Sequence, residues 1–263
     1  MLRTFLVQNF FTISDEGTED ALHDVLSIRK FVGITINDHD IPDASTICRF
    51  RNLLINNEIH QQLFDQVVSS LAAKGLVVKK GTIVDSTIIE CSTSKRNKAK
   101  ATDCDASWTK KAGNYKHGYK SHIGADADSG IITSNKTTTA KTHDATVAND
   151  LLHGGEQAVY GDSGYLGAEN RKNALSAKKY KIMRRPSTIA KLPEDEQAKA
   201  RQRQQAIAAK RAKVEHRFAT IKRLFGFKRT LYRGLKKNAA KLNIMCALAN
   251  IWTISRQACP QTA

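Results

Sequence analysis

Three carboxylates lie in stretches of sequence where an acidic side chain is unexpected. The first is Asp85, the only charged residue in the apolar, β-branched run from Gly81 to Ile89, which is typical of a strand buried on both faces. Removing an ionised carboxylate from water costs several kcal/mol unless a partner compensates its charge. The run therefore predicts that Asp85 has a partner, either a cation or backbone N–H donors at a strand end.

The second carboxylate, Asp162, follows another short apolar run, in the turn "YGDSGY". Ligand-binding groups gather at such turns because they lie at the carboxyl ends of strands. The same letters could form a serine hydrolase loop with Ser163 as nucleophile and His143 and Asp144 as the nearest base and acid. Tyr165 stands where that loop would need a further glycine, and the pattern of a nucleophile elbow is also missing. We therefore expect Ser163 to be a turn residue.

The third carboxylate, Glu215, is the only acid between Glu196 and the carboxyl terminus. It lies in a segment whose apolar residues recur at helical spacing: Val214, Phe218, Ile221 and Phe225. That spacing places Glu215 on the flank of the buried stripe, with Arg211 four residues before it and Lys222 seven after it. An ordinary ion pair with Arg211, contributing roughly 0.3 to 0.5 kcal/mol, is the alternative to a functional role.

Together the three acids would repel one another strongly, by about 4 kcal/mol for two charges 4 Å apart at an effective dielectric constant of 20. A shared site for Asp85, Asp162 and Glu215 therefore requires cations. Mg²⁺ suits carboxylate oxygens and keeps positions open for water and phosphate. Two such ions about 3.5 to 4 Å apart can activate the attacking oxygen and stabilise the leaving oxygen in a phosphoryl transfer.

The positive charge of the chain is concentrated in its last third. The formal net charge is +17, but residues 171–241 hold 23 Lys and Arg against 4 Asp and Glu, a balance of +19, which leaves −2 for the remainder. Such a field predicts a polyanionic partner, and nucleic acid is the commonest one. Basic residues that only solvate helices are the alternative; an anionic membrane surface fits less well because the basic stretch lacks a continuous apolar face.

Cysteines and apolar runs argue against other classes of protein. The five cysteines form no Cys-x-x-Cys pair, which disfavours a disulfide framework and a structural zinc site. The longest nearly apolar run, Ile244 to Ile254, is too short to cross a bilayer, and the amino end has no signal-peptide pattern. We therefore expect a cytoplasmic protein.

The periodicity divides the chain into two parts. Residues 1–75 are expected to form a helical module, with Asp43 capping one helix and Gly75 ending another. From residue 76 the pattern becomes mixed α/β, with strands in "LVVKKGTIVDSTIIE", on both sides of the turn at Asp126 and Asp128, and before Asp162. Helices are expected around 144–152 and 167–177 and from "KLPEDEQ" past Phe225, and residues 91–115 are expected to be a basic loop.

Five ordered segments carry a resemblance to a known family: "TIVDSTII", "GYKSHIGADADSGII", "HDATVANDLL", "VYGDSGYLG" and "RAKVEHRFATIKRLFG". They closely resemble the DDE transposases of bacterial insertion sequences. The resemblance implies an RNase H-like α/β domain over residues 76–263, with a mixed five-stranded sheet flanked by helices and a partial helical module ahead of it. It also implies that Asp85, Asp162 and Glu215 are the catalytic, metal-binding triad.

The same resemblance implies cofactors and partners. Similar enzymes use two Mg²⁺ ions, for which Mn²⁺ substitutes, to free a 3′-OH at the ends of their element and to join it to target DNA. The terminal inverted repeats and the target would be bound by basic residues of the last third: Arg211, Arg217, Lys222 and Arg223. The family's Arg-x₃-Glu-x₆-Lys signature is met by Arg211, Glu215 and Lys222, but Ala208 stands where a tyrosine is frequent.

Relatives are also expected to self-associate in the catalytic complex. They usually have more helical sequence ahead of the segment that begins this chain, so the amino-terminal module is expected to be shortened. The alternative function is therefore that of a catalytically impaired copy that only binds DNA or inhibits a full-length transposase.

Overall fold

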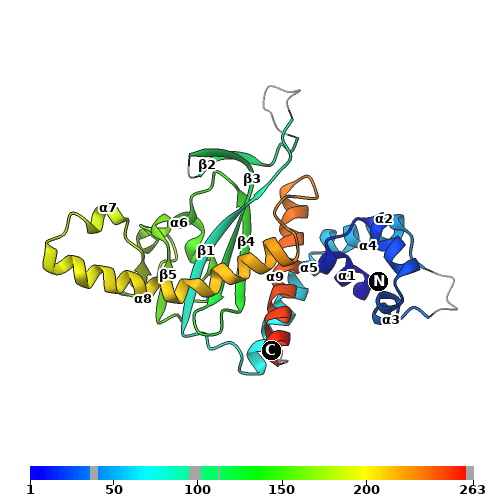
Figure 1. The fold of residues 1–263 in the computed structure, drawn as a ribbon, viewed down its shortest axis with the longest axis horizontal. Helices are drawn as coiled ribbons and strands as arrows, with labels where there is room; N and C mark the ends of the chain where they lie inside the picture. Colours follow the sequence, from blue (N-terminus) through cyan, green and yellow to red (C-terminus); the bar gives the residue numbers. More distant parts are fainter. Residues whose placement is uncertain (36–40, 95–101, 112, 259–263) are drawn as a thin grey trace.

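A mixed β-sheet with long helices packed on it follows a group of amino-terminal helices (Figure 1). The computed structural model describes residues 1–35, 41–94, 102–111 and 113–258. The first helices are α1 (Leu2–Phe11), α2 (Asp15–Asp24), α3 (Leu26–Val32), α4 (Ala44–Asn56) and α5 (Ile59–Ala73). The strands are β1 (Gly81–Glu90), β2 (Ser107–Lys111), β3 (Asn114–Asp126), β4 (Ile132–Thr139), β5 (Ala158–Gly161) and β6 (Tyr180–Ile182). The later helices are α6 (Asp144–Val147), α7 (Pro186–Ile189), α8 (Glu194–Ala219) and α9 (Leu235–Ala258).

The sheet brings the ends of β1 and β5 together. Strand β3 pairs antiparallel with β1 and β4, and β1 pairs parallel with β5, which pairs parallel with β6. Five strands lie in the order β4-β3-β1-β5-β6, and β2 pairs with the first part of β3, so the sheet is mixed as expected but has six strands where five were expected. Because Ile83 lies opposite Tyr160 in the parallel pair, the residues that follow β5 lie beside the second half of β1.

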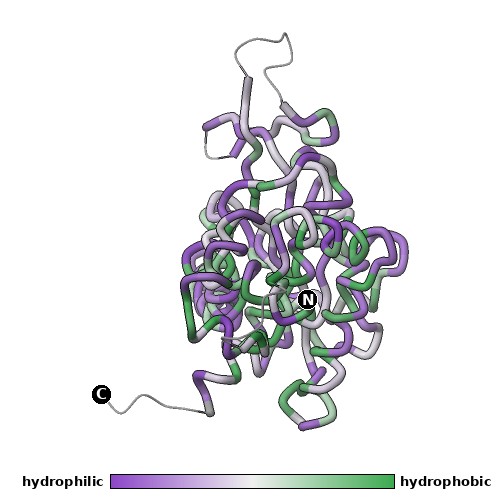
Figure 2. The backbone as a smooth tube through the Cα atoms, turned by 90° about the vertical axis from the view of Figure 1, so that its right-hand side faces the viewer, coloured by the Kyte–Doolittle hydropathy of each residue, from purple (hydrophilic) through white to green (hydrophobic). Residues whose placement is uncertain are grey.

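Helices cover both faces of the sheet. On one face α8 and α9 pack on β1, β3 and β4 (Figure 1), and the buried core there includes Ile83, Ile123, Val214, Phe218 and Met245. The stripe predicted from the sequence is buried as expected. On the other face a smaller core surrounds Val84 and Tyr165 under α6. Hydrophilic and apolar stretches alternate along the backbone in Figure 2, as expected for elements that each turn one face inward.

The amino-terminal helices are tied to the carboxyl-terminal one. Helix α5 runs along α9, and α1 also packs against α9. Asp43 caps α4 as predicted, its carboxylate accepting from the N–H of Thr46 (2.7 Å). Gly75, with φ +71°, follows the end of α5. None of the helices in the described part of the chain is both long and apolar enough to cross a membrane.

Three sequence-based expectations need correction. The helix expected over 167–177 is wrong: a 3₁₀ turn forms at Ala168–Asn170 and another begins at Ala177, because Gly167 and Asn173 adopt left-handed backbone angles that interrupt a helix. Residues 91–115 are not all loop, since they contain β2; residues 95–101 and 112 lie outside the described residues. The long helix ends before Phe225, because α8 passes into a π-helical turn, Thr220–Leu224.

Candidate active site

Asp85 lies in the middle of β1 and faces α8. Its side chain is 13% exposed, and its Oδ2 lies 3.3 Å from Nη2 of Arg211 on α8. The N–H of Ser86 donates to Oδ1 (2.8 Å). Burial raises the pKa of Asp85 to about 6, against the opposing effects of Arg211 and the Ser86 N–H, and the negative charge of Asp162 adds to the rise. The prediction that Asp85 has a compensating partner is therefore confirmed, but the compensation is incomplete.

Asp162 follows β5 and caps a 3₁₀ turn, Ser163–Tyr165. Its Oδ1 accepts from the N–H of Gly164 (2.8 Å). A Cβ at Gly164 would lie 3.0 Å from Asp162 Oδ1 and 3.3 Å from Asp144 Oδ2, so a larger residue would press on both carboxylates. Because β5 pairs parallel with β1, Asp162 at the end of β5 comes within electrostatic reach of Asp85.

Ser163 is a turn residue, as the sequence predicts, and has no triad around it. His143 instead caps α6, its Nδ1 accepting from the N–H of Ala145 (3.3 Å). Because that nitrogen is engaged in the cap, the pattern of a nucleophile, base and acid is not assembled at Ser163.

Glu215 lies one helical turn beyond Arg211 on α8, and its side chain is exposed. It lines a cavity of about 620 Å³ together with Glu90 and Lys222. Within the described ranges, no group of three or more His, Cys, Asp or Glu side chains is gathered closely enough to hold a metal ion. The structure thus places Asp162 within electrostatic reach of Asp85 and leaves Glu215 outside that pair.

The four expected DNA-contacting cations are placed differently from one another. Arg211 pairs with Asp85, and Lys222 donates to the backbone oxygen of Ile88 (2.8 Å). Burial, and then the neighbouring lysines, lower the pKa of Lys222 to about 8. Arg223 is exposed and lines the cavity with Glu215. Arg217 does not face the carboxylates, because it packs toward α9, where it donates to the hydroxyl of Thr253.

A π-helical turn sets the direction of Lys222. The N–H of Phe225 donates to the oxygen of Thr220 (3.1 Å), five residues earlier, so the helix is wider there than the α-helical spacing assumes. Such turns insert one residue into a helix and are frequent at functional sites. The wider turn lets the Lys222 ammonium reach the β1 backbone while Ile221 stays buried.

Two family models match the chain. A family model described as a transposase DDE domain matches residues 78–251, and a second, described as a transposase domain (DUF772), matches residues 1–53. The chain belongs to the DDE transposase family. No solved structure matches it. The family assignment carries a role in transposition, DNA as a partner, and the general use of a divalent metal.

Two carboxylates of this transposase have the chemistry that such a metal requires. Asp85 on β1 and Asp162 directly after the neighbouring β5 offer hard oxygen donors, and the charge of Asp162 adds to the energetic cost of ionising Asp85. A hard divalent cation relieves that cost and takes one or two carboxylates with water completing its shell. The pair therefore fits Mg²⁺, whereas Glu215 in its present position does not join the set.

The sequence did not single out a second polar cluster on the other face of β1. Asp144, at the start of α6, accepts from the hydroxyl of Ser86 (2.8 Å) and lies 3.1 Å from the ammonium of Lys120. His122 Nδ1 is 3.7 Å from the same carboxylate, and burial lowers the pKa of His122 to about 4, so this imidazole is neutral. The alternation of Lys120 and His122 on β3 indicated a shared face, but nothing in the sequence linked that face to Asp144.

Proposed function

We propose that this transposase cleaves DNA at the ends of its insertion sequence in a metal-dependent reaction and joins the freed 3′-OH to target DNA. The observation that carries the proposal is the pair of carboxylates, Asp85 and Asp162, on adjacent parallel strands. A buried carboxylate whose charge is only partly compensated is the state expected of a ligand that awaits a cation. Two Mg²⁺ ions, or Mn²⁺ in their place, would activate the attacking oxygen and stabilise the leaving one.

The residues of the chain have separate roles in this proposal. Asp85 and Asp162 hold the metal, and Glu215 completes the ligand set once metal and DNA are bound. The side chain of Glu215 can turn toward them because it is exposed on α8, one turn beyond Arg211. In the first step water attacks the phosphorus and the 3′ oxygen leaves; in the second that 3′-OH attacks a target phosphodiester and a target 3′ oxygen leaves.

The cations near the carboxylates orient the phosphate. Arg211 partly offsets the charge of Asp85, and we propose that it would turn to the scissile phosphate when Asp85 holds a metal ion. A guanidinium suits this role because it keeps its proton and binds two oxygens at once. Lys222 and Arg223 border the cavity next to Glu215 and would contact flanking phosphates of the terminal repeats or of the target. Self-association of two copies would bring two element ends together.

The test is a cleavage and strand-transfer assay with DNA that carries the element's terminal repeats, in the presence of Mg²⁺. We expect Asp85→Asn and Asp162→Asn to abolish cleavage while salt-sensitive DNA binding remains. Asp150→Asn is the matched control, because Asp150 pairs with Lys136 and both side chains are exposed. A folded Asp85→Asn protein with full activity would rule the proposal out.

The exposed position of Glu215 favours a second candidate, DNA binding without cleavage. In that case the chain would act as an inhibitor of a full-length copy. The same assay separates the two functions: binding without metal-dependent cleavage by the unmodified protein supports the second.

A further inference from the structure

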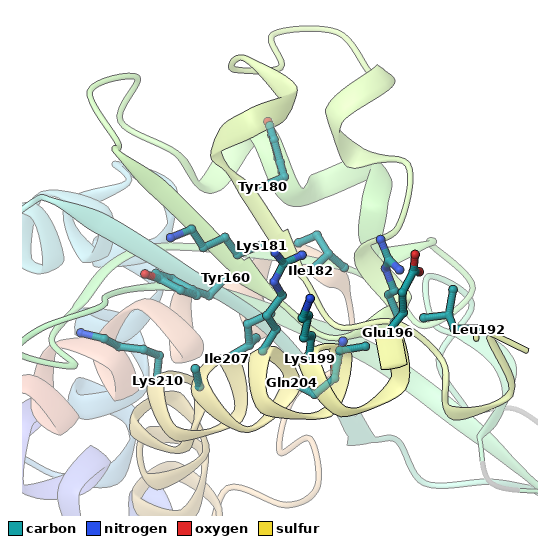
Figure 3. Close-up of a pocket in the computed structure, with 14 residues that line it drawn as sticks. Tyr160, Tyr180, Lys181, Ile182, Leu192, Glu196, Lys199, Gln204, Ile207 and Lys210 are labelled. Carbon is teal, nitrogen blue, oxygen red and sulfur yellow. The ribbon is translucent and has the colours of Figure 1, made fainter. Parts of the chain in front are cut away.

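A second hollow lies outside the candidate active site, between the β5–β6 edge of the sheet and the first half of α8 (Figure 3). Its volume is about 840 Å³. Tyr160 and Lys181 line it from the strands, and Lys199, Ile207 and Lys210 line it from α8 (Figure 3). We call this hollow the β6–α8 groove. Nothing in the metal chemistry proposed above uses it.

The wall formed by α8 is cationic along its length. Lys199, Arg203 and Lys210 are separated by four and seven residues, so they recur on one face of the helix. Lys210 is paired with Asp128 (3.0 Å), which leaves Lys199 and Arg203 as the exposed cations of this face. Arg184 and Lys181 add charge from the opposite wall, and Glu196 is the only acid among the lining residues. Neither Lys199 nor Arg203 has a carboxylate partner among the described residues. Two exposed cations held on one face without acids to pair with suit a polyanion.

The floor of the β6–α8 groove is apolar and aromatic. Ile182 and Ile207 line it, Leu192 lines the end far from Tyr160 (Figure 3), and the Lys181 ammonium lies over the Tyr160 ring at 5.8 Å from its centroid. A DNA duplex presents phosphates outward and makes no use of an apolar floor. A single strand presents both phosphates and unpaired bases, and proteins bind it with cationic rims and aromatic platforms.

One end of the groove reaches the candidate active site. Lys210 adjoins Arg211, whose guanidinium pairs with Asp85, and Tyr160 stands two residues before Asp162. Arg211 Nη1 also lies 3.3 Å from the sulfur of Met183, which directly follows β6. A strand lying along the groove would therefore arrive at the paired carboxylates.

We propose that the β6–α8 groove binds an unpaired segment of a DNA strand next to the bond that is cleaved. Lys199 and Arg203 contact its phosphates, and Tyr160 stacks on a base. The inference rests on the proposed function only in placing the bound strand next to the bond that is cleaved. Binding of the strand to the groove requires neither metal nor cleavage.

The experiment measures fluorescence anisotropy of a labelled single strand of about 12 nucleotides, a length within the range such sites cover, and of the same sequence as a duplex. It uses the full chain without metal. The double variant Lys199→Gln with Arg203→Gln is expected to bind the single strand about tenfold more weakly, with a salt slope lower by about 1.4, because two phosphate contacts are lost. Arg201→Gln is the matched control: Arg201 is exposed on the opposite face of α8 and bonds only to Gln197 (3.1 Å).

A third variant tests the aromatic platform. Tyr160→Ala is expected to weaken single-strand binding about tenfold and to leave duplex binding nearly unchanged, whereas Tyr160→Phe keeps the ring and the affinity. The proposal is overturned if Lys199→Gln with Arg203→Gln binds the single strand as Arg201→Gln does, or if single strand and duplex are weakened equally.

The two proposals fail in distinguishable ways. Normal single-strand binding by the groove variants, with cleavage abolished in Asp85→Asn, would refute the groove and leave the function standing. Weakened single-strand binding in those variants, with full cleavage in Asp85→Asn, would refute the function and leave the groove standing.

Discussion

The guanidinium of Arg211 lies 3.3 Å from the carboxylate of Asp85, and both side chains are almost buried. This pair joins the middle of β1 to α8, so two residues 126 positions apart in the sequence partly cancel each other's charge. Arg211 supplies at Asp85 the positive charge that we propose a metal ion supplies during the reaction. The pair therefore links the stability of the fold to the chemistry proposed for the site.

Replacing Arg211 by glutamine tests that link through the pH dependence of the free energy of unfolding. Without the guanidinium, the pKa of Asp85 rises further above its value of about 6. Because the folded-state pKa exceeds the ordinary value of 3.8, the stabilisation from Asp85 is complete below about pH 4 and is lost as pH rises through about 6. Arg211→Gln is therefore expected to lower the free energy of unfolding by about 3 kcal/mol at pH 8 and by clearly less at pH 5, as measured by urea denaturation.

Arg201→Gln is again the control, with no expected change at either pH. Equal losses at pH 5 and pH 8 in Arg211→Gln would show that the guanidinium acts by packing alone.

Gly164→Ala tests how closely the turn after β5 holds its carboxylate. The added methyl would meet Asp162 Oδ1 at 3.0 Å and Asp144 Oδ2 at 3.3 Å. Displacing a ligand by a fraction of an ångström is expected to lower the cleavage rate tenfold or more, since catalytic groups tolerate about 1 Å of misplacement poorly. The comparison is Gly155→Ala, whose methyl would make ordinary contacts with His153 at 3.4 Å. Equal rates for the two variants would argue against a reactive Asp162.

Asp144→Asn tests the cluster on the other face of β1. The Lys120 side chain is 13% exposed and would be left without its carboxylate. Leaving one partner of a buried ion pair alone is expected to lower the free energy of unfolding by about 3 kcal/mol. Asp150→Asn removes the partner of Lys136, an exposed pair, and is expected to change stability by less than about 1 kcal/mol. Thermal or urea unfolding of both variants gives the comparison, and similar losses would contradict it.

Glu215→Gln tests whether the exposed acid closes the metal site. Its charge lies outside the Asp85–Asp162 pair in the metal-free protein, so its removal is expected to leave stability unchanged. Metal-dependent cleavage is nevertheless expected to fall by at least about a hundredfold if Glu215 becomes a ligand in the complex with DNA. Glu194→Gln, at the exposed start of α8, is the control. Full cleavage by Glu215→Gln would assign the metal to the two aspartates without it.

The sequence was informative where the physical signal is local. A lone charge in an apolar run identified Asp85, and helical spacing identified the buried stripe before and after Glu215. The pairing of β1 with β5 was not predictable, because strand order depends on contacts between distant segments. The helix expected over 167–177 failed for a local reason, since left-handed residues at Gly167 and Asn173 broke a pattern that composition alone favoured.

Contacts between charged groups were the least predictable feature. An ion pair between Arg211 and Glu215 fitted the helix spacing, yet Arg211 pairs with Asp85 instead. Leaving a carboxylate unpaired costs more free energy inside the protein than in water. Arg211 therefore pairs with the buried Asp85 and not with the exposed Glu215. The same reasoning explains why Asp144 and Lys120 lie together although nothing in the sequence paired them.

A buried lysine far from the carboxylates gives the last prediction. Lys241 on α9 is 4% exposed, its ammonium donates to Asn9 Oδ1 on α1 (2.9 Å), and burial lowers its pKa to about 7. The nearby positive charge of Arg51 adds to this lowering. Because the unfolded chain keeps the ordinary value of 10.5, it binds more protons than the folded chain between about pH 7 and pH 10. The stability contribution of Lys241 is therefore expected to rise with pH across this window.

Lys241→Met removes the titrating group and keeps most of the volume of the side chain. We compare the free energies of unfolding of the unmodified protein and of Lys241→Met. Between pH 7 and pH 9.5 the unmodified protein is expected to gain roughly 2 to 3 kcal/mol of stability relative to the variant. Lys237→Met, an exposed position on the same helix, corrects for the lysines and tyrosines that titrate elsewhere. A difference that stays constant over this range would mean that the ammonium of Lys241 reaches water in the folded protein, and that α1 and α9 are joined less tightly than the bond to Asn9 implies.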